Sequence, residues 1–268
     1  MSKNKYEPQS VSEIIFSNDE SRQLIVDIVS GAVPFPNAGT TGILLYGIYG
    51  TGKTTLANLL PKAIEQGQTG HSLGMPEEFF ACQFGHAGTA IIDLVRKQTD
   101  VRCLNESGNH YYIFDEVDSL SKSAQRSLKS TLNSRRATFI LTTNNFRLVE
   151  AGVRDRCHCI PFNAAPAPRW LPLCRRILAD AGVTGVSDQA LINVIASGNG
   201  SARNILDAVI SVVIKVRRQS AAQAAVVEHD TYKQKPARRW LFAICCSSQC
   251  RSVYAFALSD TRRLRRAT

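Results

Sequence analysis

One short stretch constrains the fold of this chain more than any other part of the sequence. Residues 47–54 read GIYGTGKT and match the pattern G-x-x-x-x-G-K-[ST] in full. Glycines in this pattern let backbone N–H groups point inward at phosphate oxygens without steric cost. The pattern needs a strand before it and a helix after it, and the apolar run at 43–46 and the helical pattern at 53–66 meet this requirement. The sequence therefore predicts a strand, a phosphate-binding loop and a helix in succession.

The residues of this loop are the candidates for binding a nucleoside triphosphate with Mg²⁺. Lys53 is expected to reach the β- and γ-phosphates, and Thr54 to place its hydroxyl on Mg²⁺. The helix that follows presents its positive N-terminal end to the same phosphates. The full candidate set is Gly47, Ile48, Tyr49, Gly50, Thr51, Gly52, Lys53, Thr54 and Thr55.

A pair of acids forms the second signal. Residues 111–116 read YYIFDE, an apolar run that ends in two carboxylates. Asp115, at the end of the expected strand, would hold the Mg²⁺ shell, and Glu116 would orient and deprotonate water for attack on the γ-phosphate. Acids often cap strands, so the pair alone is a weak signal. Downstream of a phosphate-binding loop, it predicts hydrolysis as well as binding.

Apolar runs alternate with helical patterns in the first 163 residues. Besides the strand and helix that flank the loop, expected strands cover 79–82, 111–114, 138–141 and 157–162, and expected helices cover 90–97 and 123–132. Pro61 is expected to kink the helix after the loop or to end it early. This alternation predicts an α/β fold with a mostly parallel sheet that helices cover on both faces.

The rest of the chain changes character twice. A Pro-rich link is expected at 164–172, and helical patterns follow at 173–181, 188–196 and 202–216. The sequence thus predicts an α/β nucleotide-binding domain over 1–163, a small all-helical domain over 164–218, and a poorly ordered basic tail over 219–268.

The net charge of +10 belongs largely to this tail. Residues 215–268 carry 12 Lys and Arg against 3 Asp and Glu, while the first 214 residues carry 20 against 19. The charge of the whole chain is therefore no evidence that the nucleotide-binding domain binds DNA. Two interpretations of the tail stay open: a basic arm that binds nucleic-acid backbone, or an aberrant extension without function.

The cysteines and the apolar runs bear on compartment and metal binding. No apolar run approaches the roughly 20 residues that span a bilayer, and the polar start, MSKNKYEPQS, lacks the apolar core of a signal peptide. We expect a cytoplasmic protein with no membrane partner and with reduced thiols. On a strand, Cys157 and Cys159 would share one face, but no second ligand pair follows at zinc spacing, and Cys245, Cys246 and Cys250 lack a fourth ligand. Structural cysteines are the favoured interpretation.

Taken in order, these motifs resemble those of AAA+ ATPases, and within that group those of clamp-loader subunits, the replication factor C small subunit and the bacterial polymerase III gamma/tau subunit. The resemblance covers about 5–216. Residues 5–8, KYEP, are similar to the family's Lys-Tyr-Arg-Pro start, with Glu7 where an arginine is usual. Residues 123–128, SAQRSL, are similar to its helix after the acidic strand and imply that Gln125 couples DNA contact to Glu116.

Three further motifs assign residues by the same resemblance. Residues 138–144, TFILTTN, resemble the sensor 1 strand and imply that Asn144 holds the attacking water or the γ-phosphate. Residues 200–204, GSARN, resemble the start of the sensor 2 helix and imply that Arg203 contacts the γ-phosphate from a helical lid. By composition alone, Asn144 is a turn residue and Arg203 an exposed helix residue.

The third motif is RDRC at 154–157, which resembles the family's Arg-Ser-Arg-Cys box. It implies that Arg156 is an arginine finger that enters the ATP site of a neighbouring subunit. Asp155 stands where serine is usual, and its carboxylate could pair with Arg156 within the same chain.

The resemblance implies a Mg²⁺-dependent ATPase that loads a sliding clamp on primer-template DNA during replication. It also implies a homo- or hetero-oligomer of AAA+ subunits with sites at the interfaces. Two family features have no counterpart here: the cysteine set of the bacterial zinc module, and a collar domain after the lid. Two alternatives stay open, an AAA+ remodelling ATPase of a phage or mobile element and a structural subunit that binds ATP without hydrolysing it.

Overall fold

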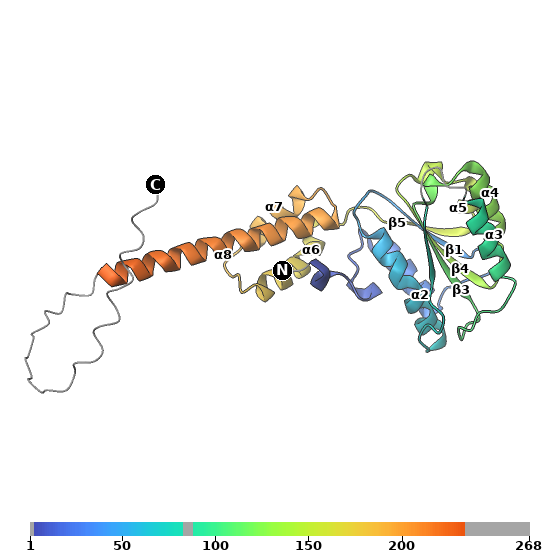
Figure 1. The fold of residues 1–268 in the computed structure, drawn as a ribbon, viewed down its shortest axis with the longest axis horizontal. Coiled ribbons are helices and arrows are strands. Elements are labelled where there is room, and N and C mark those ends of the chain that lie inside the picture. The colour runs from blue at the N-terminus through green and yellow to red at the C-terminus, as the bar shows by residue number, and fades with distance from the viewer. Residues whose placement is uncertain (1–2, 83–87, 234–268) are drawn as a thin grey trace, which may run out of the picture. The chain divides into compact units, whose positions relative to one another are not determined.

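A computed structural model describes residues 3–82 and 88–233 of the chain (Figure 1). Its centre is a five-stranded sheet in the order β2-β3-β4-β1-β5, in which every neighbouring pair is parallel. The strands are β1 (Gly42–Tyr46), β2 (Glu78–Ala81), β3 (His110–Asp115), β4 (Ala137–Thr143) and β5 (Cys157–Pro161). The predicted strands and the α/β class with a parallel sheet are confirmed.

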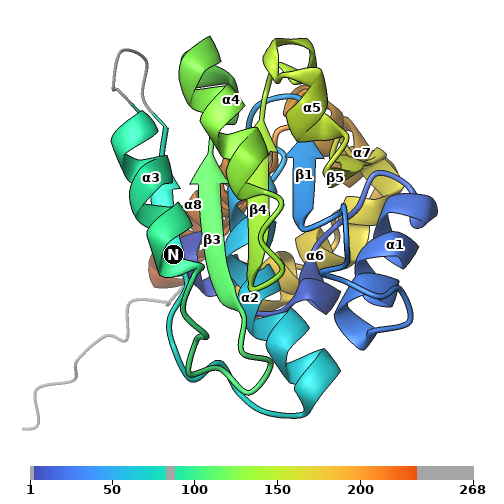
Figure 2. The same cartoon turned by 90° about the vertical axis from the view of Figure 1, so that its right-hand side faces the viewer.

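Helices cover both faces of the sheet, which is why its strands are continuous apolar runs. Ile43 and Leu45 of β1 pack in one cluster with α1 (Asp19–Ser30) and α2 (Lys53–Thr69). Leu44 points the other way and packs with α3 (Thr89–Gln98), α4 (Lys122–Thr131) and α5 (Ala151–Arg154). Figure 2 shows α3 and α4 on one side of the strands. Cys157 and Cys159 pack against this second cluster from one face of β5, as the strand period predicts.

Helix α2 does not end at Pro61, so the expectation that proline ends it early is wrong. The helix continues through Pro61 to Thr69. Proline removes one hydrogen bond from a helix interior, but Leu60 and Ile64 beside it are fully buried. Burial of this apolar face stabilises the helix past the proline.

The expected Pro-rich link is also wrong over most of its length, because α6 (Ala167–Asp180) begins inside it. Pro168 lies in the first helical turn, where a missing N–H costs nothing. Helix α6 packs with α7 (Asp188–Ser197) and the first part of α8 (Ala202–Lys233) around a third cluster that includes Trp170, Cys174 and Val209. Tyr6, from the 3-10 helix at Lys3–Tyr6, is buried in the same cluster. The boundary between the α/β and helical domains at 163/164 stays a prediction.

Helix α8 runs to Lys233, past Val216, where its periodicity predicted an end. Residues 219–233, expected to be poorly ordered, are therefore helical. Alanines at 221, 222, 224 and 225 explain this, since alanine has the highest helix propensity. The remainder of the predicted tail, with Cys245, Cys246 and Cys250, lies outside the described residues. Contacts between residues divide the chain into two compact units, Met1–Ser220 and Ala221–Thr268.

Within the described ranges, no helix is long and apolar enough to cross a membrane. In the same ranges, His, Cys, Asp and Glu nowhere form a group of three that could hold a metal ion.

Candidate active site

The loop between β1 and α2 has a backbone that only glycine adopts easily. Gly47, Gly50 and Gly52 have φ angles of +155°, +74° and +101°, which side chains with a Cβ rarely adopt. A Cβ on Gly47 would lie 2.4 Å from the carbonyl oxygen of Phe162. The glycines therefore permit both the turn and its close packing against the residue after β5.

The ammonium group of Lys53 lies inside this loop. Its Nζ donates hydrogen bonds to the carbonyl oxygens of Gly47 at 3.1 Å and Ile48 at 2.7 Å, and the residue is buried. Burial lowers the pKa of Lys53, while the nearby carboxylates, Asp115 first, act against this shift. A loop of glycines around a buried cation fits the phosphates of a nucleotide, which would replace the two carbonyl oxygens as acceptors.

A hydroxyl and a carboxylate meet beside the loop. Thr54, in the first turn of α2, donates from Oγ1 to Asp115 at the end of β3, at 3.0 Å to Oδ1 and 3.3 Å to Oδ2. Mg²⁺ prefers oxygen ligands of these kinds. The two predicted metal residues are thus in contact, and their donor atoms fit that ion.

The two residues predicted to handle water also lie together. Glu116 follows β3 and Asn144 follows β4, and these strands are parallel neighbours, so their carboxyl ends meet at one edge. Asn144 Nδ2 donates to Glu116 Oε1 at 3.4 Å. The flanks of Asn144 are fixed by Asp118, which accepts from Thr143 Oγ1 at 2.8 Å and from Asn145 Nδ2 at 2.9 Å.

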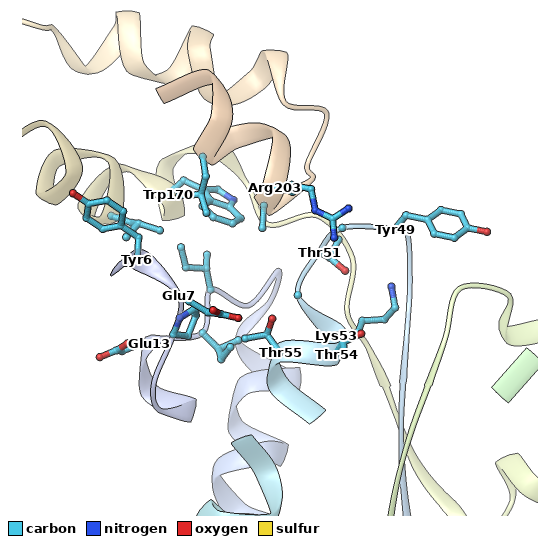
Figure 3. Close-up of a pocket in the computed structure, with 18 of the residues that line it drawn as sticks. Tyr6, Glu7, Glu13, Tyr49, Thr51, Lys53, Thr54, Thr55, Trp170 and Arg203 are labelled. Carbon is cyan, nitrogen blue, oxygen red and sulfur yellow. The ribbon is translucent and has the colours of Figure 1, made fainter. Parts of the chain in front are cut away.

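These groups line one cleft of about 790 Å³ (Figure 3). Its polar side is formed by the loop from Tyr49 to Thr55 together with Asp115, Glu116, Thr142 and Asn144. Its other side is largely apolar and is contributed by the N-terminal segment, α6 and α8, through Tyr6, Pro8, Ile14, Ile15, Trp170, Leu173 and Leu206. The charged residues Glu7, Glu13, Arg169 and Arg176 line the same side. Apolar side chains beside a phosphate loop are suited to a nucleotide base.

Sequence reasoning missed this apolar wall. Tyr6 and Pro8 belong to a recognised motif, but nothing in their spacing shows that they line the cleft. The prolines at 164–172 predict a link, so the sequence does not indicate that Trp170 lies on a helix. Among the loop candidates, the side chains of Ile48 and Tyr49 are 46% and 68% exposed, and the Tyr49 ring points away from the cleft (Figure 3).

Arg203 enters the cleft from the start of α8. Its side chain extends toward the phosphate loop (Figure 3). The same end of α8 touches the loop through its backbone, because Ala202 N donates to Gly50 O at 2.8 Å. The structure thus places a cation and a helix start over the loop.

Arg156 lies elsewhere. It precedes the amino end of β5, whereas the loop follows the carboxyl end of the parallel strand β1, so the two lie at opposite edges of the sheet. Its Nε donates to Asn133 Oδ1 at 2.8 Å and its Nη1 to Gly152 O at 2.9 Å. Asp155 forms a looser ion pair at 3.9 Å. Arg156 is therefore not part of the cleft in its own chain.

Gln125 is likewise held away from Glu116. Its Nε2 donates to the carbonyl oxygens of Leu120 and Leu148, both at 3.2 Å, and its Oε1 accepts from Glu150 N at 2.7 Å. These bonds use the amide to tie α4 to the segment before α5. Within the described residues, no hydrogen bond joins Gln125 to Glu116.

Comparison with known proteins agrees with this geometry. Residues 43–162 match the model of the ATPase family associated with various cellular activities (AAA). Structures of RuvB mutants from Thermotoga maritima are similar in fold, with TM-scores of 0.56 and 0.57 at 15% identity, over 82% of this chain and 67% and 68% of theirs. No curated protein matches the chain.

Proposed function

Because residues 43–162 match the model of the AAA ATPase family, we propose that this protein binds ATP with Mg²⁺ in the cleft and hydrolyses it. One observation carries the proposal. The residues suited to the metal, Thr54 and Asp115, and those suited to water, Glu116 and Asn144, converge beside the phosphate loop. A site that only bound nucleotide would not need the second pair.

The cleft geometry supports a role for Lys53, Glu116, Asn144 and Arg203, and the motif resemblance supports one for Arg156. Lys53 transfers its hydrogen bonds from the loop carbonyls to the phosphates. Glu116 accepts the proton of the attacking water, and Asn144 orients that water. Mg²⁺, when bound, neutralises charge that develops on the phosphate oxygens. Arg203 adds positive charge from α8, and Arg156 of a neighbouring subunit completes the site.

We further propose that hydrolysis drives work on primer-template DNA, namely the loading of a sliding clamp. The ordered motifs from the N-terminal KYEP to the sensor 2 helix support this. So does the outer face of α4, where Lys122 and Arg126 are exposed and lie one turn apart. Two cations at this spacing suit contacts with a phosphate backbone.

Phosphate release by the wild type and by Glu116→Gln tests the ATPase. Primed DNA and a candidate clamp are included in the assay. We expect the wild type to be active, and the variant to lose hydrolysis by roughly 10² to 10⁴-fold while it still binds ATP. Glu13→Gln, which changes another carboxylate lining the cleft, is the matched control and should keep activity.

Pull-down of a sliding clamp in each nucleotide state tests the loading proposal separately. Capture with ATP and release after hydrolysis is the expected result. Failure to bind a clamp in any state, in a protein that hydrolyses ATP, would reject clamp loading and leave the ATPase proposal in place.

A further inference from the structure

A single buried hydroxyl joins the two acids of the site. Thr142 of β4 is 1% exposed, and its Oγ1 contacts both Asp115 and Glu116. It donates to Asp115 Oδ1 through a short hydrogen bond and accepts from the backbone N–H of Glu116 at 3.1 Å. Because Glu116 N–H supplies its own proton, the one hydroxyl proton of Thr142 is free to go to the carboxylate. Both bonds are therefore compatible and are made at once.

We propose that Thr142 is a positioning residue, whose hydroxyl sets the geometry of both acids for Mg²⁺-dependent nucleotide binding and hydrolysis. The inference rests on the proposed ATPase function. Groups that hydrogen-bond a metal-binding carboxylate orient it, and their loss typically lowers metal affinity about 10 to 100-fold. Thr142 has this relation to Asp115.

Asp115 accepts hydrogen bonds from two hydroxyls, and the proposed function explains why both are needed. Thr54 and Thr142 both donate to Asp115. Under the proposed function, the Thr54 hydroxyl would serve Mg²⁺ as a ligand and would be less available to Asp115. Thr142 lies within a fully buried strand, so its bond persists and keeps the carboxylate aligned.

The contact of Thr142 with Glu116 involves the backbone N–H of Glu116. Glu116 has φ +58° and ψ +51°, the left-handed region that residues other than glycine adopt at a cost. Its N–H bond to Thr142 holds it in this conformation at the end of β3. The conformation in turn places the Glu116 carboxylate beside Asn144. Loss of the Thr142 hydroxyl should therefore affect hydrolysis as well as the metal.

The same strand supplies a matched control. Thr138 is also fully buried on β4 and lies four positions before Thr142, so both side chains lie on one face of the strand. Its Oγ1 has no hydrogen-bond partner among the described residues. Thr138→Val thus removes a buried hydroxyl without removing a bond.

The test measures binding of a fluorescent ADP analogue as Mg²⁺ is titrated, alongside ATP hydrolysis. We expect Thr142→Val to raise the Mg²⁺ concentration needed for half-maximal binding by about tenfold and to slow hydrolysis. Thr142→Ser, which keeps the hydroxyl, and Thr138→Val should both match the wild type. Thermal unfolding checks that each variant is folded.

Three results would overturn the inference. The first is a folded Thr142→Val protein with the Mg²⁺ dependence of the wild type. The second, which applies even if that variant does not fold, is a Thr142→Ser protein with strongly shifted Mg²⁺ dependence. The third is an equal shift in Thr138→Val, which would indicate a general effect of β4 packing. A wild type without Mg²⁺-dependent nucleotide binding would instead overturn the proposed function and this inference together.

Discussion

Polar side chains are held differently at the carboxyl ends of the strands (the carboxyl edge of the sheet) and at their amino ends (the amino edge). At the carboxyl edge, Asp115, Glu116 and Thr142 bond to one another and face a cleft. At the amino edge, Arg156 bonds to Asn133 and to a backbone carbonyl, and does not line that cleft. The carboxyl edge is assembled within one chain. Any part that Arg156 plays in hydrolysis requires a second subunit.

The largest expected effect is on hydrolysis in a mixture of two variants, one altered at the amino edge and the other at the carboxyl edge. If Arg156 acts as proposed, Arg156→Ala should lower hydrolysis about 10³-fold, the effect typical of arginine fingers, without changing nucleotide affinity. Lys53→Ala should abolish nucleotide binding in its own cleft. In a mixture of the two, a site can pair an intact Lys53 with an intact Arg156 of the neighbour. Phosphate release by the mixture should therefore exceed that of either variant alone.

Arg135→Ala is the control for this experiment, because Arg135 is exposed near Asn133. It should leave hydrolysis unchanged. If Arg156→Ala lowers only the stability of the fold and mixing does not restore hydrolysis, Arg156 stabilises its own subunit. The proposed role of Arg156 in a neighbouring site would then be wrong.

A smaller effect is expected where α8 meets the loop. Gly50 occupies a position that the motif leaves free, yet a Cβ there would lie 2.4 Å from Ser201 Oγ. Gly50→Ala should weaken nucleotide binding about tenfold, the result of an overpacked contact of roughly 1–3 kcal/mol. Adding Ser201→Gly removes the obstacle at little cost to the helix start and should restore part of the affinity, measured by nucleotide titration.

Gly70→Ala separates this clash from backbone strain. Gly70 has φ +78° at the other end of α2, and nothing lies within 4 Å of a Cβ there. It should lower stability slightly and leave affinity intact. Equal affinity losses with and without Ser201→Gly would show that the carboxyl edge does not depend on contact with α8.

Much of the carboxyl edge could be predicted from sequence, because its chemistry sits in short motifs attached to buried strands. The apolar run before Asp115 and the run before Asn144 each predict a strand, and parallel strands bring their carboxyl ends together. The contact between Glu116 and Asn144 follows from this arrangement. Thr142 does not, because a threonine inside an apolar strand gives no sign of which neighbour its hydroxyl meets.

The amino edge and the helical region were less predictable for physical reasons. The partners of Arg156, Asn133 and Gly152, come from separate segments, and only the fold brings them together. Proline weighs against a helix in sequence, yet α6 starts one residue before Pro168 because the first turn tolerates it. Local propensity cannot reveal contacts that depend on distant segments.

A second hydrogen-bond network lies away from the cleft, around Glu65. Glu65 of α2 is fully buried and accepts hydrogen bonds from Tyr111 OH at 2.8 Å, Ser107 Oγ at 2.7 Å and Ser107 N at 2.9 Å. Burial raises the pKa of Tyr111, so its phenol stays protonated and donates. These bonds attach the segment before β3 to the end of α2, and none reaches the cleft residues.

Tyr111→Phe should therefore lower stability without lowering activity. Removing one donor from a buried carboxylate is expected to cost about 1–3 kcal/mol of unfolding free energy, measured by urea denaturation. Tyr112→Phe is the control, since the hydroxyl of Tyr112 donates to the neutral amide of Gln98 at 3.2 Å, and it should cost less. Nucleotide affinity and phosphate release should stay at wild-type values in both. A loss of activity in Tyr111→Phe at temperatures where it is fully folded would mean that polar contacts away from the cleft also affect the carboxyl edge. The carboxyl edge would then not act independently of the rest of the sheet.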